Sequence, residues 1–290
     1  MQDPADGRLP AGRSLRSIRR LLSPTGGARF DPLGLVGFAL LIAVWQLLTG
    51  VIPRFSLPSP LAVAHRIGAD FFSAESLAAY GLPDTSLLDS MIYTATNVLI
   101  ALAIGTLAGT VTGLVTARVR WVRSIADPVL MVTGTIPILV LAPFFLIWFG
   151  TGRISALLLV IIYVVVIMYV YAQRAAENLD PVYEEGALTL GASRARIIGD
   201  VLLPGTFPQV LGGIRIALAG AWGLEAIAEL LGSQHGIGKL VQVLAGSTDI
   251  EGIFAALLVL AVVAVLFDML ASAIVARITV WNRHPSSSGA

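Results

Sequence analysis

Few ionisable residues are placed where they could do chemistry inside an apolar chain. Glu225 and Glu229 lie four residues apart in an otherwise apolar run, so they share one face if that run is helical. A carboxylate that faces lipid is costly, so this face should point into a helix bundle or toward water. Two interpretations stay open: the acids line a solute pathway, or each pairs with a group of the same chain. The candidate partners are Lys239, Arg153, Thr133 and Thr135.

Residues for covalent, metal or nucleotide chemistry are missing from the sequence. The absence of cysteine excludes disulfides and thiolate metal sites, and the three histidines form no His-x-x-x-His pair. No Gly-x-x-x-x-Gly-Lys-Ser/Thr motif occurs, so the chain has no phosphate-binding loop of that type. We therefore expect no catalytic residue, no metal site and no cofactor bound by this chain.

A polar segment over residues 180–204 combines helix signals with exposed apolar side chains. Asp180 can cap a helix with Pro181 in its first turn, and Gly191 should end it. Ser193 can then cap a second short helix, which Pro204 should stop. Several apolar residues lie in this water-facing loop, so part of it should be covered by the bundle and part by a partner protein. They are Val182, Leu188, Leu190, Ile197, Ile198, Val201 and Leu202.

The composition indicates a membrane protein. Of 290 residues, 56% are hydrophobic and 13% are charged, against about 25% charged residues in a soluble domain. The mean hydropathy is +0.85. Six apolar segments are each near the length that crosses roughly 30 Å of hydrocarbon. They are 33–52, 89–117, 125–149, 154–172, 207–232 and 252–276.

The distribution of Lys and Arg predicts the orientation of these six spans. With the N-terminus in the cytoplasm, fourteen basic residues lie inside and four outside, so both termini should be cytoplasmic. The inside set is Arg8, Arg13, Arg16, Arg19, Arg20, Arg29, Arg118, Arg120, Arg123, Arg174, Arg194, Arg196, Arg277 and Arg283. The outside set is Arg54, Arg66, Arg153 and Lys239.

The predicted organisation is an all-α integral membrane protein with a basic tail (1–32), a six-span domain (33–278) and a short C-terminal tail (279–290). The first span is too long for the apolar core of a signal peptide, so we expect it to stay uncleaved. In the outer loop, 60–72 predicts a short amphipathic helix capped by Ser59. The second span should pack closely through Gly105, Gly109 and Gly113, and prolines at 128, 137 and 143 should kink the third.

The loop also resembles a known family, the permeases of binding-protein-dependent ATP-binding-cassette importers. The family's cytoplasmic signature is Glu-Ala-Ala, three residues, Gly, and a later Leu-Pro. Glu185, Ala187, Gly191, Leu203 and Pro204 match it, whereas Gly186 stands where Ala is usual. The resemblance covers about residues 33–278.

Further matches are similar to the branch that imports sulfonates, taurine and nitrate. They are Leu57-Pro58-Ser59-Pro60, Ile136-Pro137 followed by Pro143 and Ile147-Trp148-Phe149-Gly150, Leu190-Gly191-Ala192-Ser193, Gly213-Ile214-Arg215, Ala221-Trp222, Ala228-Glu229 and Gly236-Ile237-Gly238. Tyr93 and Asn97 depart from the branch, which usually has Arg and Gly at these positions.

The resemblance implies the architecture of a type I importer permease and a mechanism. The coupling residues would be Glu184, Glu185, Ala187, Gly191, Ala192, Ser193, Leu203 and Pro204, seated in a groove of a separate ATPase. Two ATPase subunits, which bind ATP and Mg, would rock two copies of the permease in the inner membrane between inward- and outward-open states. An extracytoplasmic solute-binding protein would deliver the solute. The candidate pathway residues are Tyr93, Asn97, Thr133, Thr135, Glu225 and Glu229. No nucleic acid partner is expected.

Two other classes compete with this reading. A secondary transporter or channel would need no ATPase, but it would more often show charges in several spans and repeated halves. An integral membrane enzyme would need clustered acids or histidines, such as Asp-x-x-Asp, and none is present.

Overall fold

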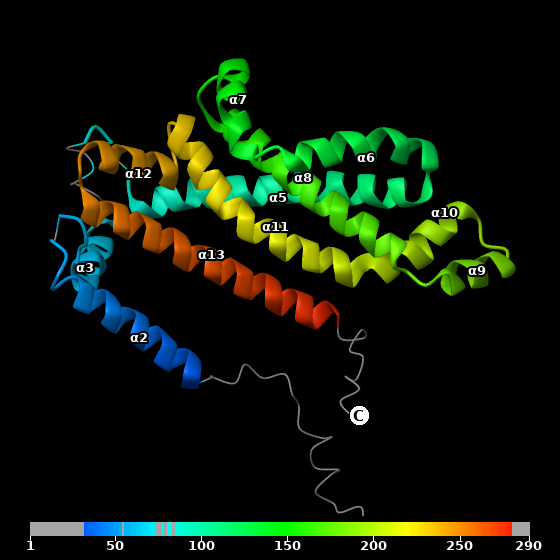
Figure 1. Ribbon diagram of the computed structural model, residues 1–290, viewed down its shortest axis with the longest axis horizontal. Helices are drawn as coiled ribbons and strands as arrows, with labels where there is room; N and C mark the ends of the chain where they lie inside the picture. Colours follow the sequence, from blue (N-terminus) through cyan, green and yellow to red (C-terminus); the bar gives the residue numbers. More distant parts are fainter. Residues whose placement is uncertain (1–31, 54, 73–76, 78–79, 83–84, 280–290) are drawn as a thin grey trace, which may run out of the picture. The chain divides into compact units, whose positions relative to one another are not determined.

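The computed structural model describes residues 32–53, 55–72, 77, 80–82 and 85–279. Within these ranges the chain is helical and has no strand (Figure 1). Almost all of the two predicted tails lies outside the described residues. The elements in chain order are α2 (Pro32–Leu48), α3 (Pro60–Asp70), α5 (Leu87–Arg118), α6 (Arg120–Thr135), η1 (Ile138–Leu141), α7 (Ala142–Phe149), α8 (Arg153–Glu177), α9 (Pro181–Thr189), α10 (Arg194–Ile197), η2 (Ile198–Leu202), α11 (Leu203–Gly232), α12 (Ile237–Gly246) and α13 (Ile250–Ile278).

All six predicted apolar segments form helices, but not all are equally long. Among the described residues, four helical runs are long and apolar enough to cross a membrane, and a bent pair, α6 with η1–α7, makes a fifth if counted as one span. The predicted first span ends as a helix at Leu48, and the 17 residues of α2 rise about 25 Å. α2 belongs to one compact unit, and the helices after Thr49 form a second, larger unit.

The core of the larger unit is the close packing of α5 against α8. A Cβ added at Gly109 would lie 2.5 Å from the carbonyl oxygen of Val165, and one at Gly113 would lie 2.6 Å from that of Tyr169. A Cβ at Gly105 would lie 2.6 Å from Cβ of Val164. The three glycines therefore let two backbones approach closely, which confirms their predicted packing role.

The third predicted span is broken rather than kinked. α6 and η1–α7 meet at an angle of 93°. Ile136 adopts an extended conformation (φ −74°, ψ 125°), which the ring of Pro137 imposes on the residue before it. Pro128 lies within α6 and Pro143 in the first turn of α7, so only Pro137 produces the break.

The prediction that Pro204 stops the second helix of the loop is wrong. Residues Ala195–Gly232 form one helical run, and Pro204 lies in the first turn of α11. The π-helical turn η2 precedes it, with the Leu203 N–H donating to the Ile198 carbonyl five residues earlier. This wider turn accommodates the proline ring and its missing N–H, so the chain enters the fifth span without a break.

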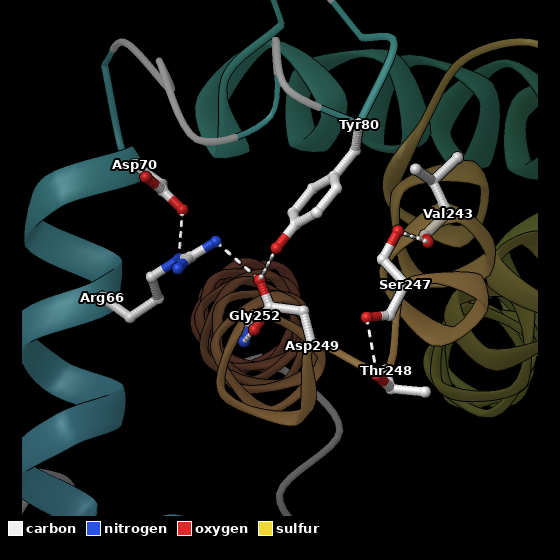
Figure 2. A network of polar contacts seen from close by, with 8 residues as sticks. All are labelled: Arg66, Asp70, Tyr80, Val243, Ser247, Thr248, Asp249 and Gly252. Atoms are coloured by element: carbon white, nitrogen blue, oxygen red, sulfur yellow. Dashed lines mark hydrogen bonds and ion pairs between the residues drawn. The ribbon is translucent and has the colours of Figure 1, made fainter.

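The predicted amphipathic helix is present as α3, and a polar network joins it to α13 (Figure 2). Ser59 caps α3 by accepting the Ala62 N–H. Arg66 donates to Asp70 at 2.5 Å and to Asp249 at 2.7 Å. Asp249 also caps α13 through the Gly252 N–H at 2.9 Å. Asp249 thus fixes the start of α13 against α3.

The glycine packing of α5 predicts the effect of one methyl group. Gly109→Ala should destabilise the permease by about 1–3 kcal/mol, because the new Cβ overlaps the backbone of α8. The measurement is the thermal unfolding midpoint of the purified chain in nanodiscs. The control is Gly223→Ala in α11, where a Cβ meets nothing within 4 Å. Equal midpoints for both variants would contradict the packing account.

Candidate functional site

The two intramembrane acids lie inside the bundle, as their shared face predicted. Glu225 and Glu229 belong to α11, and both side chains are fully buried at 0% exposure. A buried carboxylate without donors is strongly unfavourable in an apolar setting, so the groups around each acid determine what it does.

Glu229 is held by helices α5 and α12. The Thr94 hydroxyl lies 2.9 and 2.8 Å from the two carboxylate oxygens, and the Gly238 N–H donates to Oε2 at 3.0 Å. Thr94 also accepts the Ile237 N–H at 2.9 Å. These contacts satisfy two of the N–H groups at the start of α12 that have no partner within their own helix. Glu229 therefore pairs within its own chain and caps α12 from a neighbouring helix.

The Gly236-Ile237-Gly238 sequence is explained by this cap. Gly236 has φ +100°, a conformation that favours glycine, and a Cβ there would overlap the Glu229 carboxylate. A Cβ at Gly238 would overlap the Ala226 carbonyl oxygen and lie 2.7 Å from Cβ of Glu229. Both glycines are thus needed for α12 to begin against α11.

Glu225 is connected to the Arg153 guanidinium by a relay of two hydrogen bonds through Asn97. The Asn97 amide donates to Glu225 Oε1 at 2.8 Å, and the Arg153 Nε donates to the Asn97 carbonyl oxygen at 2.6 Å. Asn97 is fully buried, whereas Arg153 reaches the surface at the start of α8. Glu225 Oε2 is buried and has no hydrogen-bond partner among the described residues. The guanidinium therefore acts on Glu225 through the amide and not by direct contact.

The structure brings four of the six candidate pathway residues together. Tyr93 joins Asn97, Glu225 and Glu229, because its ring lies 5.5 Å below the Arg153 guanidinium and 5.5 Å from the His235 ring. The other two lie apart on α6, where Thr133 is half-buried and Thr135 exposed, and each hydroxyl donates to a carbonyl of its own helix.

Three of the suggested partners of the acids are not their partners. Thr133 and Thr135 lie on α6, and Lys239 donates instead to Gln242 at 2.9 Å. Sequence reasoning missed Thr94 and the backbone of Gly238. Thr94 was detectable as a polar residue one turn from Asn97 in the same span, but no side-chain pattern marks a backbone N–H.

The loop over 180–204 forms a hairpin of two helices, α9 and α10. Asp180 caps α9 through the Val182 N–H at 3.0 Å. Gly191 ends α9 in a left-handed conformation (φ +79°), and the Ala192 N–H donates to the Ala187 carbonyl at 3.0 Å. Ser193 accepts the Arg196 N–H at 3.3 Å. The predicted caps and the predicted break are therefore confirmed.

Among the described residues, one ion pair joins the hairpin to the bundle. Glu184 lies 3.1 Å from Arg118, in the last turn of α5, while Glu185 remains exposed. A hollow of about 210 Å³ separates α9 from the end of α5, with Leu188 and Ile198 in its wall. Leu203 and Pro204 lie at the start of α11, beyond the hairpin itself.

Four of the seven apolar residues singled out in the 180–204 loop are exposed. Ile197 and Leu202 are buried by the bundle. Leu190, at the tip, is 90% exposed, and Val182, Tyr183 and Leu188 are more than half exposed. Exposed apolar surface of this kind is typical of sites that contact another protein or a membrane.

The cap formed by Glu229 predicts how α12 depends on it. Glu229→Ala should leave the Gly238 N–H buried without an acceptor, at a cost of about 1–3 kcal/mol, whereas the Thr94 hydroxyl can still donate to the Ser90 carbonyl. Hydrogen exchange in α12 should then speed up by roughly tenfold. Gln242→Ala, on the same helix, should change it little. Unchanged exchange in Glu229→Ala would show that the carboxylate does not hold α12.

Curated relatives match most of the chain. The taurine transport system permease protein TauC of Escherichia coli K12 is 29% identical over 247 residues, which cover 84% of this chain and 87% of the relative. The putative aliphatic sulfonates transport permease protein SsuC of Bacillus subtilis 168 is 27% identical and covers 86% and 87%. The riboflavin transport system permease protein RibX of Chloroflexus aurantiacus is 28% identical and covers 92% and 94%.

Solved structures share the fold. The MetNI methionine ABC transporter, in an inward-facing conformation, aligns with a TM-score of 0.61 at 17% identity, over 71% of this chain and 99% of that one. A bacterial ABC transporter involved in alginate import aligns with a TM-score of 0.60 at 16% identity, over 91% and 98%. The architecture predicted from the resemblance is therefore confirmed.

A family model locates this likeness in the chain. The model of the binding-protein-dependent transport system inner membrane component matches residues 101–280, which include the hairpin and both buried acids. The chain belongs to this family, the membrane-spanning permease subunits of ATP-binding-cassette importers.

Proposed function

We propose that this permease carries a small sulfonate, such as taurine or an alkanesulfonate, into the cytoplasm. The observation that carries the substrate class is the match to the taurine and aliphatic sulfonate permeases over more than four fifths of the chain. The riboflavin permease also matches, so a heterocyclic solute is the competing class.

The energy source in this proposal is a separate ATPase. The sequence contains no phosphate-binding loop, so ATP and Mg²⁺ belong on the partner. The hairpin supports such a partner, because a tip residue that is 90% exposed and apolar is unfavourable in water unless a protein covers it. Ala187, Gly191, Ala192 and Ser193 shape this hairpin, so their role is to present it to the ATPase.

Transport requires an assembly around this chain. Two copies of the permease pair with two ATPase subunits in the cytoplasmic membrane, and an extracytoplasmic binding protein delivers the solute. The chain's domains in this scheme are the tails, 1–32 and 279–290, and the six-span domain between them.

The orientation in this scheme is N-in and C-in. The hairpin and the α5–α6 turn lie at one end of the larger unit, whereas α3 and α12 lie at the other (Figure 1). Arg118 and Arg123 at the first end bind acids of the α8–α9 region, which is consistent with a basic cytoplasmic side.

The exposed hairpin tip provides a direct test of ATPase coupling. Leu190→Asp should abolish co-purification of the ATPase and solute uptake, because a carboxylate would have to be buried in an apolar contact. The variant should still insert into the membrane in normal amounts. Leu61→Asp is the matched control, since Leu61 is 78% exposed on α3, at the other end of the unit. A Leu190→Asp complex that stays assembled and active would exclude the hairpin as the coupling element.

The topology has its own test. A reporter fused after Arg174 should lie in the cytoplasm, and one fused after residue 78 should lie outside, because fourteen of eighteen counted basic residues flank the inner ends. Alkaline phosphatase and fluorescent-protein fusions at both positions measure this. A cytoplasmic signal at residue 78 is incompatible with the six-span orientation.

A further inference from the structure

We infer that a polar pocket at the outer end of the permease binds the solute and complements both a negative and a positive charge on it. This inference rests on the proposed sulfonate substrate and extends it to a site and a charge pattern, that of an aminosulfonate. The pocket, called the outer pocket below, lies between the first turns of α5 and the start of α12. Its wall includes Asp89, Ser90, Tyr93, His235, Gly236 and Lys239.

The outer pocket has the size of a ligand site. Its volume is about 370 Å³, within the roughly 300–1,000 Å³ typical of small-molecule pockets. A two-carbon aminosulfonate therefore fits with some of its water. Ser90 is buried and Tyr93 half-buried, so the inner wall is formed by side chains that the fold holds in place.

Two opposite charges border this pocket, and neither is neutralised by the described part of the chain. The Lys239 ammonium makes one hydrogen bond, to the neutral Gln242 amide at 2.9 Å, and no ion pair. The Asp89 carboxylate accepts the Ser86 hydroxyl at 2.6 Å and likewise makes no ion pair. A solute that carries a sulfonate and an ammonium group complements both charges at once.

Three arginines of the described chain differ from Lys239 in this respect. Arg66, Arg118 and Arg123 each lie within 3.1 Å of a carboxylate. Their charges are thus satisfied within the fold, and those of Lys239 and Asp89 are left for another molecule.

Positive charge also lies close to Tyr93. The Arg153 guanidinium lies 5.5 Å from the centre of the Tyr93 ring, and the Asn97–Glu225 relay holds it there. The His235 ring packs near Tyr93 at 5.5 Å. The sulfonate end of the solute therefore belongs near Lys239 and this side of the pocket, and its ammonium near Asp89.

Lys239 is the only lysine in the sequence, which makes ligand protection measurable at a single side chain. The complete importer, in nanodiscs, is acetylated with a sulfonated N-hydroxysuccinimide ester, and mass spectrometry quantifies acetyl-Lys239. The probe is isethionate, a sulfonate without an amine that could consume the reagent. It should slow acetylation several-fold, whereas equal concentrations of ethylene glycol or chloride should not. Equal rates in all three solutions would overturn the assignment.

Transport variants then separate the two charges. Lys239→Ala should lower taurine uptake by about tenfold or more, as for loss of a charge-assisted contact, and Lys239→Arg should restore most of it. Asp89→Asn keeps an acceptor for Ser86, and it should lower uptake of taurine relative to isethionate. Gln242→Ala, which removes only the hydrogen-bond partner of Lys239, should transport both solutes almost normally.

The outcomes distinguish the pocket from the proposed substrate. If the wild-type importer takes up no sulfonate, the substrate class is wrong and the pocket assignment falls with it. If it takes up sulfonates and Lys239→Ala matches wild type, only the pocket assignment is overturned. If Lys239→Ala instead weakens binding of the solute-free and the solute-loaded binding protein equally, the surface contacts that protein and the solute site is rejected.

Discussion

The buried carboxylate of Glu229 fixes the arrangement of helices at the end of the permease where α12 begins. Inside an apolar bundle, water does not solvate a carboxylate or the first N–H groups of a helix. A buried carboxylate that accepts hydrogen bonds from such N–H groups satisfies both. Glu229 meets Gly238 at the start of α12 and Thr94 on α5, which links three helices at one point. The glycines at 236 and 238 follow from the same contact, because a side chain at either position would overlap α11. The walls of the outer pocket, which belong to α5 and α12, thus take their positions from one acid.

The same helices connect this end of the permease with the hairpin. α5 begins beside Asp89 and ends with Arg118, which pairs with Glu184 in α9. Its 32 residues rise about 48 Å. α11 continues from the hairpin without a break and carries Glu225 and Glu229. α5 is packed backbone to backbone against α8, so one closely packed helix carries both a residue of the outer pocket and the partner of the hairpin.

Much of this structure was predictable from the sequence, and the exceptions have physical reasons. Apolar length predicted the helices, and the caps at Ser59, Asp180 and Ser193 were visible because capping is a local interaction. The helix was wrongly predicted to stop at Pro204. The π-helical turn that accommodates this proline has no simple residue pattern by which it could be predicted. The partners of Glu225 and Glu229 were mostly missed because they lie on α5 and α12, more than a hundred residues away or in the backbone. Contacts of this kind depend on how the helices pack.

Under the proposed function, this chain moves a sulfonate only when a separate ATPase drives it. The direct measurement is uptake of radiolabelled taurine into proteoliposomes that contain the permease, with its ATPase and its solute-binding protein added or omitted. Uptake should occur only with all three components and hydrolysable ATP, and should be absent with a non-hydrolysable analogue. Uptake by the permease alone, driven by an ion or solute gradient, would contradict it and identify a secondary transporter.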